Sequence, residues 1–336
     1  MNEKGIAVGQ QYEFVIKKCS KVKGAALFDT DKGLYMLREF RGSEKHLEKE
    51  EELLKKISEE GWMYTDYPVR NKEGNLVSTA ADGQQYLLKR WYEARECEVY
   101  NRGLVEQGIK ALAVFHTKAY YQNLPELFAN EKNPEDDSLD LMKRRTEELR
   151  KCQKYIQNKK RKNEFEWMLA QCIPAFYEQA IAVTDKVKEL REEEIEKNQC
   201  NSKAGERRLG VIHGDYNYHN IAFADVERKP FIMNFGHCGY GIQMTDLYNY
   251  LRKVMEKHNW NEELGHRLIG AYCRIRPVDA WEYTYLQKNM AYPKKFWKIV
   301  NYYMNHGKCF IPDKDVQKLK SVIEQEHVKT NFLSTM

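Results

Sequence analysis

The sequence has no long apolar run and no ordered spacing of its cysteines, and each absence excludes a class of protein. No run reaches the roughly 18 apolar residues that a membrane-spanning helix needs. The eight cysteines are scattered and none forms a Cys-x-x-Cys pair, which argues against zinc ribbons and thioredoxin-type redox sites. The first residues contain no apolar segment of the kind found in secretory signals, so synthesis in a reducing, cytoplasmic setting is expected.

The sequence also has little excess charge of either sign. Lys and Arg number 55 against 50 Asp and Glu, which gives a net charge of +5. This balance permits anionic ligands but does not by itself predict nucleic acid as a partner. The apolar fraction of 42% and the aromatic fraction of 12% are ample for a folded core. At 336 residues the chain exceeds one ordinary core, so two lobes are expected.

The stretch from His213 to Asn220 has the residue types and spacing of a phosphotransferase catalytic loop. In kinase-like enzymes an Asp accepts the proton of the acceptor hydroxyl, and an Asn five residues later holds magnesium against the nucleotide phosphates. We therefore expect Asp215 to be the catalytic residue and Asn220 a metal ligand. His213 and Gly214 are expected to support the loop. The alternative is that the motif only satisfies a buried turn.

The segment after this loop is where the sequence departs from an active kinase. A hairpin is predicted from Ile221–Phe223 and Phe231–Met233. In kinases an Asp that binds metal follows about 14 residues after the Asn, and Asn234 occupies that place here. We assign Asn234 to the metal site, although a neutral amide is a poor ligand for a hard dication. A helix is expected to open at Thr245–Asp246, with Asp246 supporting the loop.

Residues 1–90 are predicted to form a small lobe of strands with one helix. The helix follows Gly42-Ser43 and places Leu47, Leu54 and Ile57 on one face. Residues 89–96 are predicted to be the hinge to a second lobe. The predicted strands are Tyr12–Ile16, Ala25–Phe28, Leu34–Leu37, Leu76–Thr79 and Gln85–Leu88.

Residues 91–336 are predicted to be a larger, helical lobe, with the catalytic-type loop at 211–236 and a helical insertion at 139–200. Within the insertion, residues 143–162 carry ten Lys or Arg against two Glu, too many charges to bury. We expect two antiparallel helices with solvated faces; the alternative is a contact surface for an acidic partner. The basic stretch contains only one aromatic residue, so no nucleic-acid groove is expected.

Several segments together resemble the aminoglycoside/choline kinase superfamily and, within it, the CotS-type spore coat proteins. The resemblance runs over nearly the whole chain, and the segments near the carboxyl terminus are the most family-specific. The segments that carry it are Gly33–Arg38, Glu93–Cys97, Ala113–His116, the loop at 213–220, Tyr292–Ile299, Lys318–Lys320 and Phe332–Leu333.

The resemblance implies an α+β, two-lobed protein-kinase-like fold, a place in the spore coat and other coat proteins as partners. It also puts the nucleotide-contacting Lys of the superfamily at Arg38, a change that is not conservative. The helix partner of Arg38 is expected to be Glu51, with Glu50 as the alternative. The expected phosphate loop, residues 19–25, has one glycine, so its backbone approaches a phosphate less readily. Charge from Lys21 and Lys23 is expected to substitute.

The departures at Arg38, the phosphate loop and Asn234 all weaken the same function. We therefore expect weak binding of ATP and Mg²⁺, and a kinase-fold coat component that is catalytically weak or inactive and acts in coat assembly. The alternative is an active, ATP- and magnesium-dependent phosphotransferase acting on a hydroxyl of a small molecule or saccharide. Neither a nucleic-acid partner nor membrane insertion is expected, and the sequence does not name the acceptor.

Overall fold

The computed structural model describes residues 2–22, 24–121, 125–128, 138–200, 209–224, 229–306 and 313–336. By its internal contacts the chain divides into two compact units. Unit 1 comprises residues 1–131 and 211–240, and unit 2 comprises residues 132–210 and 241–336. Each unit is therefore built from two separate stretches of the chain. The lobe limits expected from the sequence, 1–90 and 91–336, remain a prediction.

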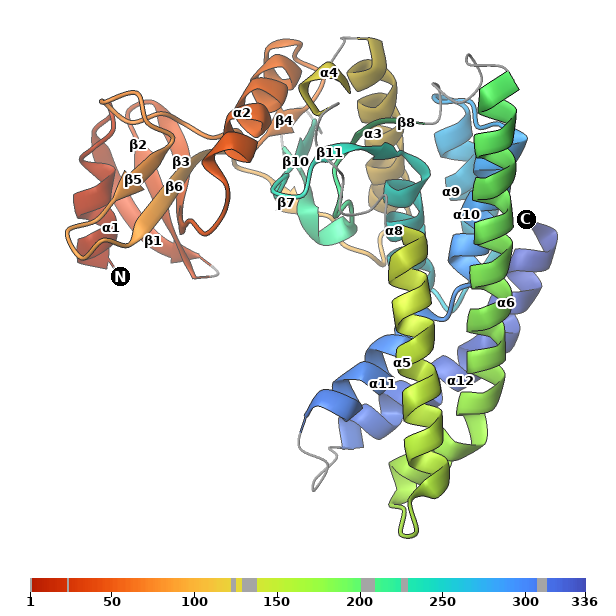
Figure 1. The fold of residues 1–336 in the computed structure, drawn as a ribbon. Coiled ribbons are helices and arrows are strands. Elements are labelled where there is room, and N and C mark those ends of the chain that lie inside the picture. Colours follow the sequence, from red (N-terminus) through yellow and green to blue (C-terminus); the bar gives the residue numbers. More distant parts are fainter. Residues whose placement is uncertain are drawn as a thin grey trace. The chain divides into compact units, whose positions relative to one another are not determined.

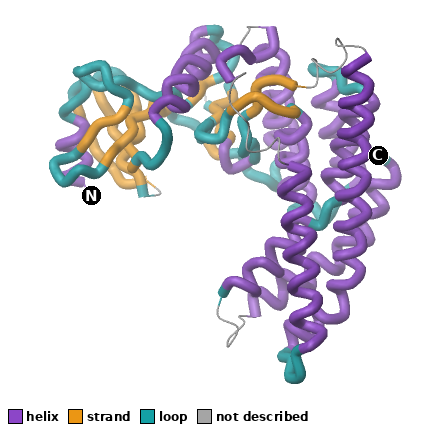
Figure 2. The backbone as a smooth tube through the Cα atoms, viewed as in Figure 1, coloured by secondary structure: helices purple, strands orange, loops and turns teal. Residues whose placement is uncertain are grey.

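The described strands lie mainly in unit 1, whereas unit 2 is almost entirely helical (Figure 2). The strands are β1 (Ile16–Val22), β2 (Ala25–Thr30), β3 (Gly33–Glu39), β4 (Tyr64–Thr65), β5 (Val77–Thr79), β6 (Gln85–Trp91), β7 (Arg95–Glu96), β8 (Leu209–Ile212), β9 (Ile221–Phe223), β10 (Pro230–Ile232) and β11 (Gly239–Ile242). The helices are α1 (Asn2–Gly9), α2 (Glu44–Glu59), α3 (Arg102–Tyr121), α4 (Pro125–Phe128), α5 (Ser138–Asn158), α6 (Glu164–Cys200), the short 3₁₀ helix η1 (Tyr218–Asn220), α8 (Met244–Met255), α9 (Glu262–Cys273), α10 (Ala280–Ala291), α11 (Lys294–Asn305) and α12 (Asp313–Thr335). All of them except η1 are labelled in Figure 1.

The first sheet of unit 1 has the order β1-β2-β3-β6-β5 and is antiparallel throughout. One of its faces buries a cluster that includes Phe28, Leu37 and Leu88, and α1 covers it through Val8. The helix approaches the sheet closely at Gly9, where an added Cβ would lie 2.7 Å from the Ile16 side chain. A side chain at this position would therefore push the helix off the core.

The strand predicted at Tyr12–Ile16 is wrong, because β1 begins only at Ile16. Tyr12 is buried, and its hydroxyl accepts a hydrogen bond from Ser78 Oγ at 3.1 Å. The N–H of Val15 donates to the Asp31 carboxylate at 2.7 Å instead of to a neighbouring strand. The apolar alternation of this segment thus reflects a loop anchored in the core and not a sheet edge.

The second sheet of unit 1 joins segments that are far apart in the sequence. Its order is β4-β10-β9-β7, with β10 parallel to β4 and antiparallel to β9. The predicted hairpin after the catalytic-type loop is present as β9 and β10. Because β4 follows α2 and β10 precedes Asn234, this sheet places the segment that follows α2 next to the catalytic-type loop.

The hinge predicted at residues 89–96 needs correction at its start. Strand β6 continues through Trp91, and Lys89 lies inside it, opposite Met36 of β3. Lys89 is buried, with 9% of its surface exposed. It is therefore part of the sheet and not part of a connecting segment.

Unit 2 contains the two predicted helices of the 139–200 region as α5 and α6, which pack against each other. Most of the cations in the basic stretch, including Lys143, Arg144, Lys160 and Arg161, are exposed, as predicted. The opposite face of the same stretch packs into the core through Leu149, Cys152 and Ile156. Helix α8 starts at Met244, as predicted from Thr245–Asp246. None of the helices in the described part of the chain combines the length and apolarity needed to cross a membrane.

Candidate active site

The catalytic-type loop leaves the end of β8 and is held by His213. The N–H of Asp215 donates to His213 Nδ1 at 3.2 Å, so the ring proton sits on Nε2, which donates to the Met233 carbonyl at 3.0 Å. His213 is fully buried. Gly214 has φ +80°, and a Cβ there would lie 2.0 Å from the His237 carbonyl oxygen. The contacts of His213 and the conformation of Gly214 therefore restrict the geometry of the loop.

Asp215 and Asn220 are brought together across the turn of the loop. Asn220 Nδ2 donates to the Asp215 carbonyl at 2.9 Å and to Asp215 Oδ2 at 3.2 Å. The Asn217 side chain accepts from the N–H of His219 and caps η1, the turn that carries Asn220. The predicted catalytic residue and the first predicted metal residue thus share one hydrogen-bonded loop.

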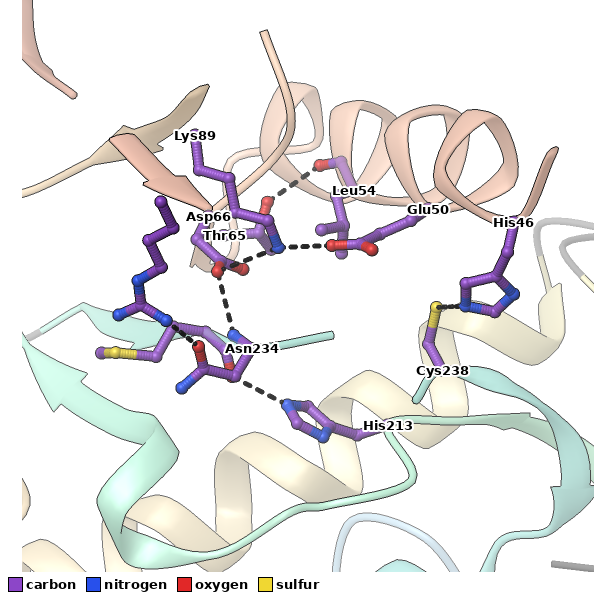
Figure 3. Close-up of polar contacts among 11 residues, drawn as sticks. His46, Glu50, Leu54, Thr65, Asp66, Lys89, His213, Asn234 and Cys238 are labelled. Atoms are coloured by element: carbon purple, nitrogen blue, oxygen red, sulfur yellow. Dashed lines mark hydrogen bonds and ion pairs between the residues drawn. The ribbon is translucent and has the colours of Figure 1, made fainter. Parts of the chain in front are cut away.

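Asn234 lies at the centre of the site, just after β10 (Figure 3). Its φ is +67°, a left-handed conformation that asparagine tolerates better than most residues. Its Nδ2 donates to Asn220 Oδ1 at 2.8 Å, and its Oδ1 accepts from Arg38 Nη1 at 2.8 Å. The two predicted metal residues are therefore bonded to each other, and the predicted phosphate-contacting residue is bonded to one of them.

The expected pair between Arg38 and Glu51 is not what the structure shows. Glu51 accepts hydrogen bonds from Lys55 at 2.7 Å and from Arg70 at 2.5 and 3.1 Å. Burial alone would raise the pKa of Glu51, but the Arg70 and Lys55 contacts lower it below its ordinary value. Glu51 thus forms ion pairs with Lys55 and Arg70, whereas Arg38 donates a hydrogen bond to Asn234.

A buried ion cluster that the sequence did not reveal lies beside Asn234 (Figure 3). Lys89 Nζ donates to Glu50 Oε1 at 2.5 Å and to Asp66 Oδ2 at 3.2 Å. The N–H of Asn234 donates to the same Asp66 oxygen at 3.0 Å. Glu50, the alternative partner weighed for Arg38, therefore pairs with a lysine from β6. The feature of the sequence that could have indicated this cluster is a lysine, Lys89, directly after the apolar run Tyr86–Leu88.

The charges of this cluster are strongly coupled because all three side chains are buried. Burial disfavours the charged ammonium, but the Asp66 and Glu50 carboxylates outweigh it and raise the pKa of Lys89. Burial raises the pKa of Asp66, with Lys89 opposing the shift. Asp66 Oδ1 is buried without a hydrogen-bond partner. The cluster thus holds one lysine between two acids, directly behind the backbone of Asn234.

The remaining predicted site residues do not join this group in the described structure. The expected phosphate loop is mostly strand, because β1 extends to Val22 and β2 starts at Ala25, with Gly24 at φ +84° between them. Lys21 is an exposed residue of β1, and Lys23 lies outside the described residues. Asp246 is fully buried in the first turn of α8 in unit 2. Its support of the loop remains a prediction.

The side chains around Asn234 do not suit a magnesium ion as they are arranged. Both amide oxygens that would face the metal already accept hydrogen bonds, from Asn234 Nδ2 and from the Arg38 guanidinium. A cation 2.8 Å from Asn234 Oδ1 repels a dication at the same place. No group of three or more His, Cys, Asp or Glu that could hold a metal ion exists among the residues that the structure describes.

The fold and this loop define a protein of the kinase-like phosphotransferase class. Residues 6–336 match the family described as "Spore coat putative kinase YutH". The chain belongs to this family, which confirms the resemblance to spore coat, kinase-like proteins inferred from the sequence. Spore coat protein S of Bacillus subtilis (strain 168) is 27% identical over 129 residues, 37% of this chain and 37% of that relative. The match spans little more than a third of that relative's length.

Solved structures of other phosphotransferases share the fold. The aminoglycoside phosphotransferase of Alicyclobacillus acidocaldarius superposes with a TM-score of 0.80 at 17% identity, covering 98% of this chain and 94% of that one. Spectinomycin phosphotransferase, solved with ADP and spectinomycin, gives 0.63 at 12% identity over 98% of both chains. At these identities the likeness concerns the fold, and it confirms the predicted α+β, protein-kinase-like architecture.

Proposed function

We propose that this protein is a kinase-fold component of the spore coat that binds nucleotide weakly, transfers phosphate poorly or not at all, and acts in coat assembly through other coat proteins. Family membership supports the coat as its location. The proposal of weak chemistry rests on one observation in the site.

That observation is the hydrogen-bonded chain from Arg38 through Asn234 to Asn220. In an active kinase the residue at position 234 is a carboxylate that binds metal and offsets the phosphate charge. Here it is a neutral amide whose oxygen is held by a guanidinium. Losing this charge removes electrostatic stabilisation where the transition state needs it. Asp215 and Asn220 then serve mainly to hold the loop.

The test is a thermal-shift titration with ATP, with and without magnesium. A ligand that binds only the folded state stabilises it by RT ln(1 + [L]/Kd), about 2.7 kcal/mol at a hundredfold excess over Kd. We expect little stabilisation at millimolar ATP and no increase on adding magnesium. A large, magnesium-dependent rise in melting temperature contradicts the proposal.

The second candidate is an active, ATP- and magnesium-dependent phosphotransferase acting on a hydroxyl of a small molecule or saccharide. The observation that favours it is the close approach of Asp215 and Asn220. In this candidate Asp215 is the base, Asn220 and Asn234 bind metal, and Arg38 holds phosphate.

Phosphate release from ATP over a panel of hydroxyl acceptors separates the two functions. Asp215→Asn is the matched control, because it keeps the size of the side chain and removes only the base. Turnover that requires both magnesium and Asp215 supports the enzyme. Turnover that is absent, or equal in the two proteins, supports the coat component.

A further inference from the structure

The turn that joins α5 to α6 carries a surplus of positive charge that has no role in the candidate active site. Residues 150–168, which span the end of α5, the turn and the start of α6, contain seven Lys or Arg and two Glu. Both carboxylates already have a cation, because Glu164 pairs with Lys320 at 3.5 Å and Glu166 pairs with Lys159. The whole segment belongs to unit 2, and Figure 1 shows the turn at one end of the two packed helices.

Four of the seven cations have no carboxylate partner among the residues that the structure describes. They are Lys154, Lys160, Arg161 and Lys162. Arg150 pairs with Glu147, and Lys151 acts electrostatically on the same carboxylate. Lys154, Lys160 and Arg161 are exposed, and Lys162 is half-buried. Like charges held this close repel one another, so an anionic partner is attracted to this surface.

An exposed tryptophan lies beside these cations. Trp167, in the first turn of α6, is 57% exposed, and the Lys162 ammonium lies over its ring, 5.4 Å from the centroid. No other large apolar side chain is exposed within residues 150–168, all of which the structure describes. Tryptophan and arginine are enriched among the residues that carry most of the binding energy of protein interfaces. The composition of this surface is therefore that of a protein-binding site.

A buried carboxylate holds the turn in one conformation. Glu166 is 1% exposed, and its Oε1 accepts hydrogen bonds from Lys159 and, at 2.5 Å, from the Tyr303 hydroxyl of α11. Its Oε2 accepts from the N–H of Asn163 at 3.1 Å, and Asn163 Oδ1 accepts from the N–H of Glu166 at 2.9 Å. This reciprocal pair is the arrangement of a capping box. Because the turn is already ordered, a partner that binds its cations does not have to order the backbone that carries them.

We propose that this surface docks an acidic segment of a partner protein, with an apolar side chain of that segment packed on Trp167. We call the surface the basic turn, and it comprises Lys154, Lys160, Arg161, Lys162 and Trp167. A helix that binds a membrane presents a broad apolar face, and a single-strand nucleic-acid groove presents several stacking rings, whereas the basic turn exposes one. The inference rests on the proposed role in coat assembly, and it names the surface and the kind of partner through which that role is exerted.

The experiment measures the fluorescence anisotropy of labelled peptides titrated with the full chain. One peptide is all glutamate, a second has a phenylalanine at the centre of the same sequence, and a third is all lysine. We expect saturable binding of both acidic peptides, weakened by salt and tighter with phenylalanine, and no binding of the lysine peptide. Lys160→Glu combined with Arg161→Glu should weaken both acidic peptides about tenfold. Trp167→Ala should weaken the phenylalanine peptide about tenfold and the all-glutamate peptide little, and Trp167→Phe should retain most of the affinity.

The matched control is Lys257→Glu combined with Arg274→Glu, which reverses the same number of exposed charges in unit 2 outside the basic turn. It should leave both affinities within a few-fold of wild type. The proposal is overturned if neither acidic peptide binds saturably, or if the control variant weakens binding as much as the variant of the turn. It is also overturned if phosphatidylglycerol vesicles or an oligothymidylate bind more tightly than the acidic peptides. Each of these failures leaves the proposal of weak nucleotide chemistry standing, because ATP and magnesium titrations test that proposal separately.

Discussion

Replacing Asn234 with Asp restores the carboxylate that an active kinase has, and its effect can be worked out from the contacts in the site. The new carboxylate keeps its contact with Arg38, now as a charge-assisted bond, which adds about 1 kcal/mol. It can no longer donate a hydrogen bond to Asn220 Oδ1, and a carboxylate oxygen of the new Asp then faces Asn220 Oδ1, although both are acceptors. It also adds a third acid near Asp66 and Asp215, and a like-charge pair at roughly 6 Å costs about 3 kcal/mol at an effective dielectric of 20.

The bond to Arg38 and the like-charge repulsion together predict that Asn234→Asp destabilises the metal-free protein by about 2 kcal/mol, and the lost bond to Asn220 adds to this cost. The melting temperature should fall by roughly 5 °C or more. Magnesium-ATP should reverse this loss, because the carboxylate supplies the hard oxygen ligand that the wild type lacks. At a hundredfold excess over Kd the gain is about 2.7 kcal/mol. Recovered binding should precede recovered turnover, since Arg38 and the short β1–β2 turn are unchanged and such defects act as a unit.

The assay is the melting temperature of wild type and Asn234→Asp, each without ligand, with magnesium, with ATP and with both. Asn234→Ala is the control, because it removes both side-chain hydrogen bonds of Asn234 without adding charge, and it should gain nothing from magnesium. A mutant with no metal-dependent gain would mean that position 234 is not at the metal site. A wild type that already gains strongly would mean that the amide is a competent ligand, and the proposal of weak chemistry would fail.

Three further outcomes follow from other contacts. Isothermal titration with ATP and magnesium should give a dissociation constant weaker than the low micromolar range; a tighter value contradicts the expected effect of Arg38 and the single-glycine turn. Lys89→Met should lower the free energy of unfolding by about 3–5 kcal/mol in urea, because its two carboxylate partners stay buried without a cation; a loss under 1 kcal/mol would show that the cluster is not buried. Burial would raise the pKa of Glu166, but its contacts with Lys159 and Tyr303 lower that pKa below the ordinary value of 4.5. The charged Glu166 therefore stabilises the fold fully above about pH 4.5, and this contribution to stability is lost as the pH falls further. Glu166→Gln should therefore be less stable than wild type at about pH 6, and the difference should shrink as the pH falls below about 4.5. Acid unfolding curves that keep a constant difference would contradict this.

The part of the site that the sequence predicted well is the part that is local in sequence. The loop, the hairpin β9–β10 and α8 follow one another within a short stretch, so motif spacing and hydrophobic pattern were enough. Asn234 could be placed because its distance from Asn220 along the chain is nearly fixed by the hairpin. The predicted strands β2, β3 and β6 were found for the same reason, since each contains a short apolar run.

What the sequence missed depends on contacts between distant segments. Arg38 and Asn234 meet although 196 residues separate them. Helix α2 carries Glu48 and Glu50–Glu52, and no local pattern says which of these carboxylates points to a cation. The parallel pairing of β4 with β10 brings Asp66 behind Asn234, and Lys89 of β6 then bonds both Asp66 and Glu50. Composition and periodicity carry no information on such pairing.

The two-part construction of unit 1 has a consequence for the order in which the protein is made. The sheet β4-β10-β9-β7 needs residues 64–65 and 95–96, which emerge early, and residues 221–232, which emerge after about 80 residues of unit 2. At 5–20 residues per second the early strands wait on the order of ten seconds for their partners. During that interval their edges are unpaired and open to wrong pairing. A ribosome that stops before residue 240 therefore releases a chain in which the segments around Arg38 and Lys89 are complete but the site itself has not yet formed.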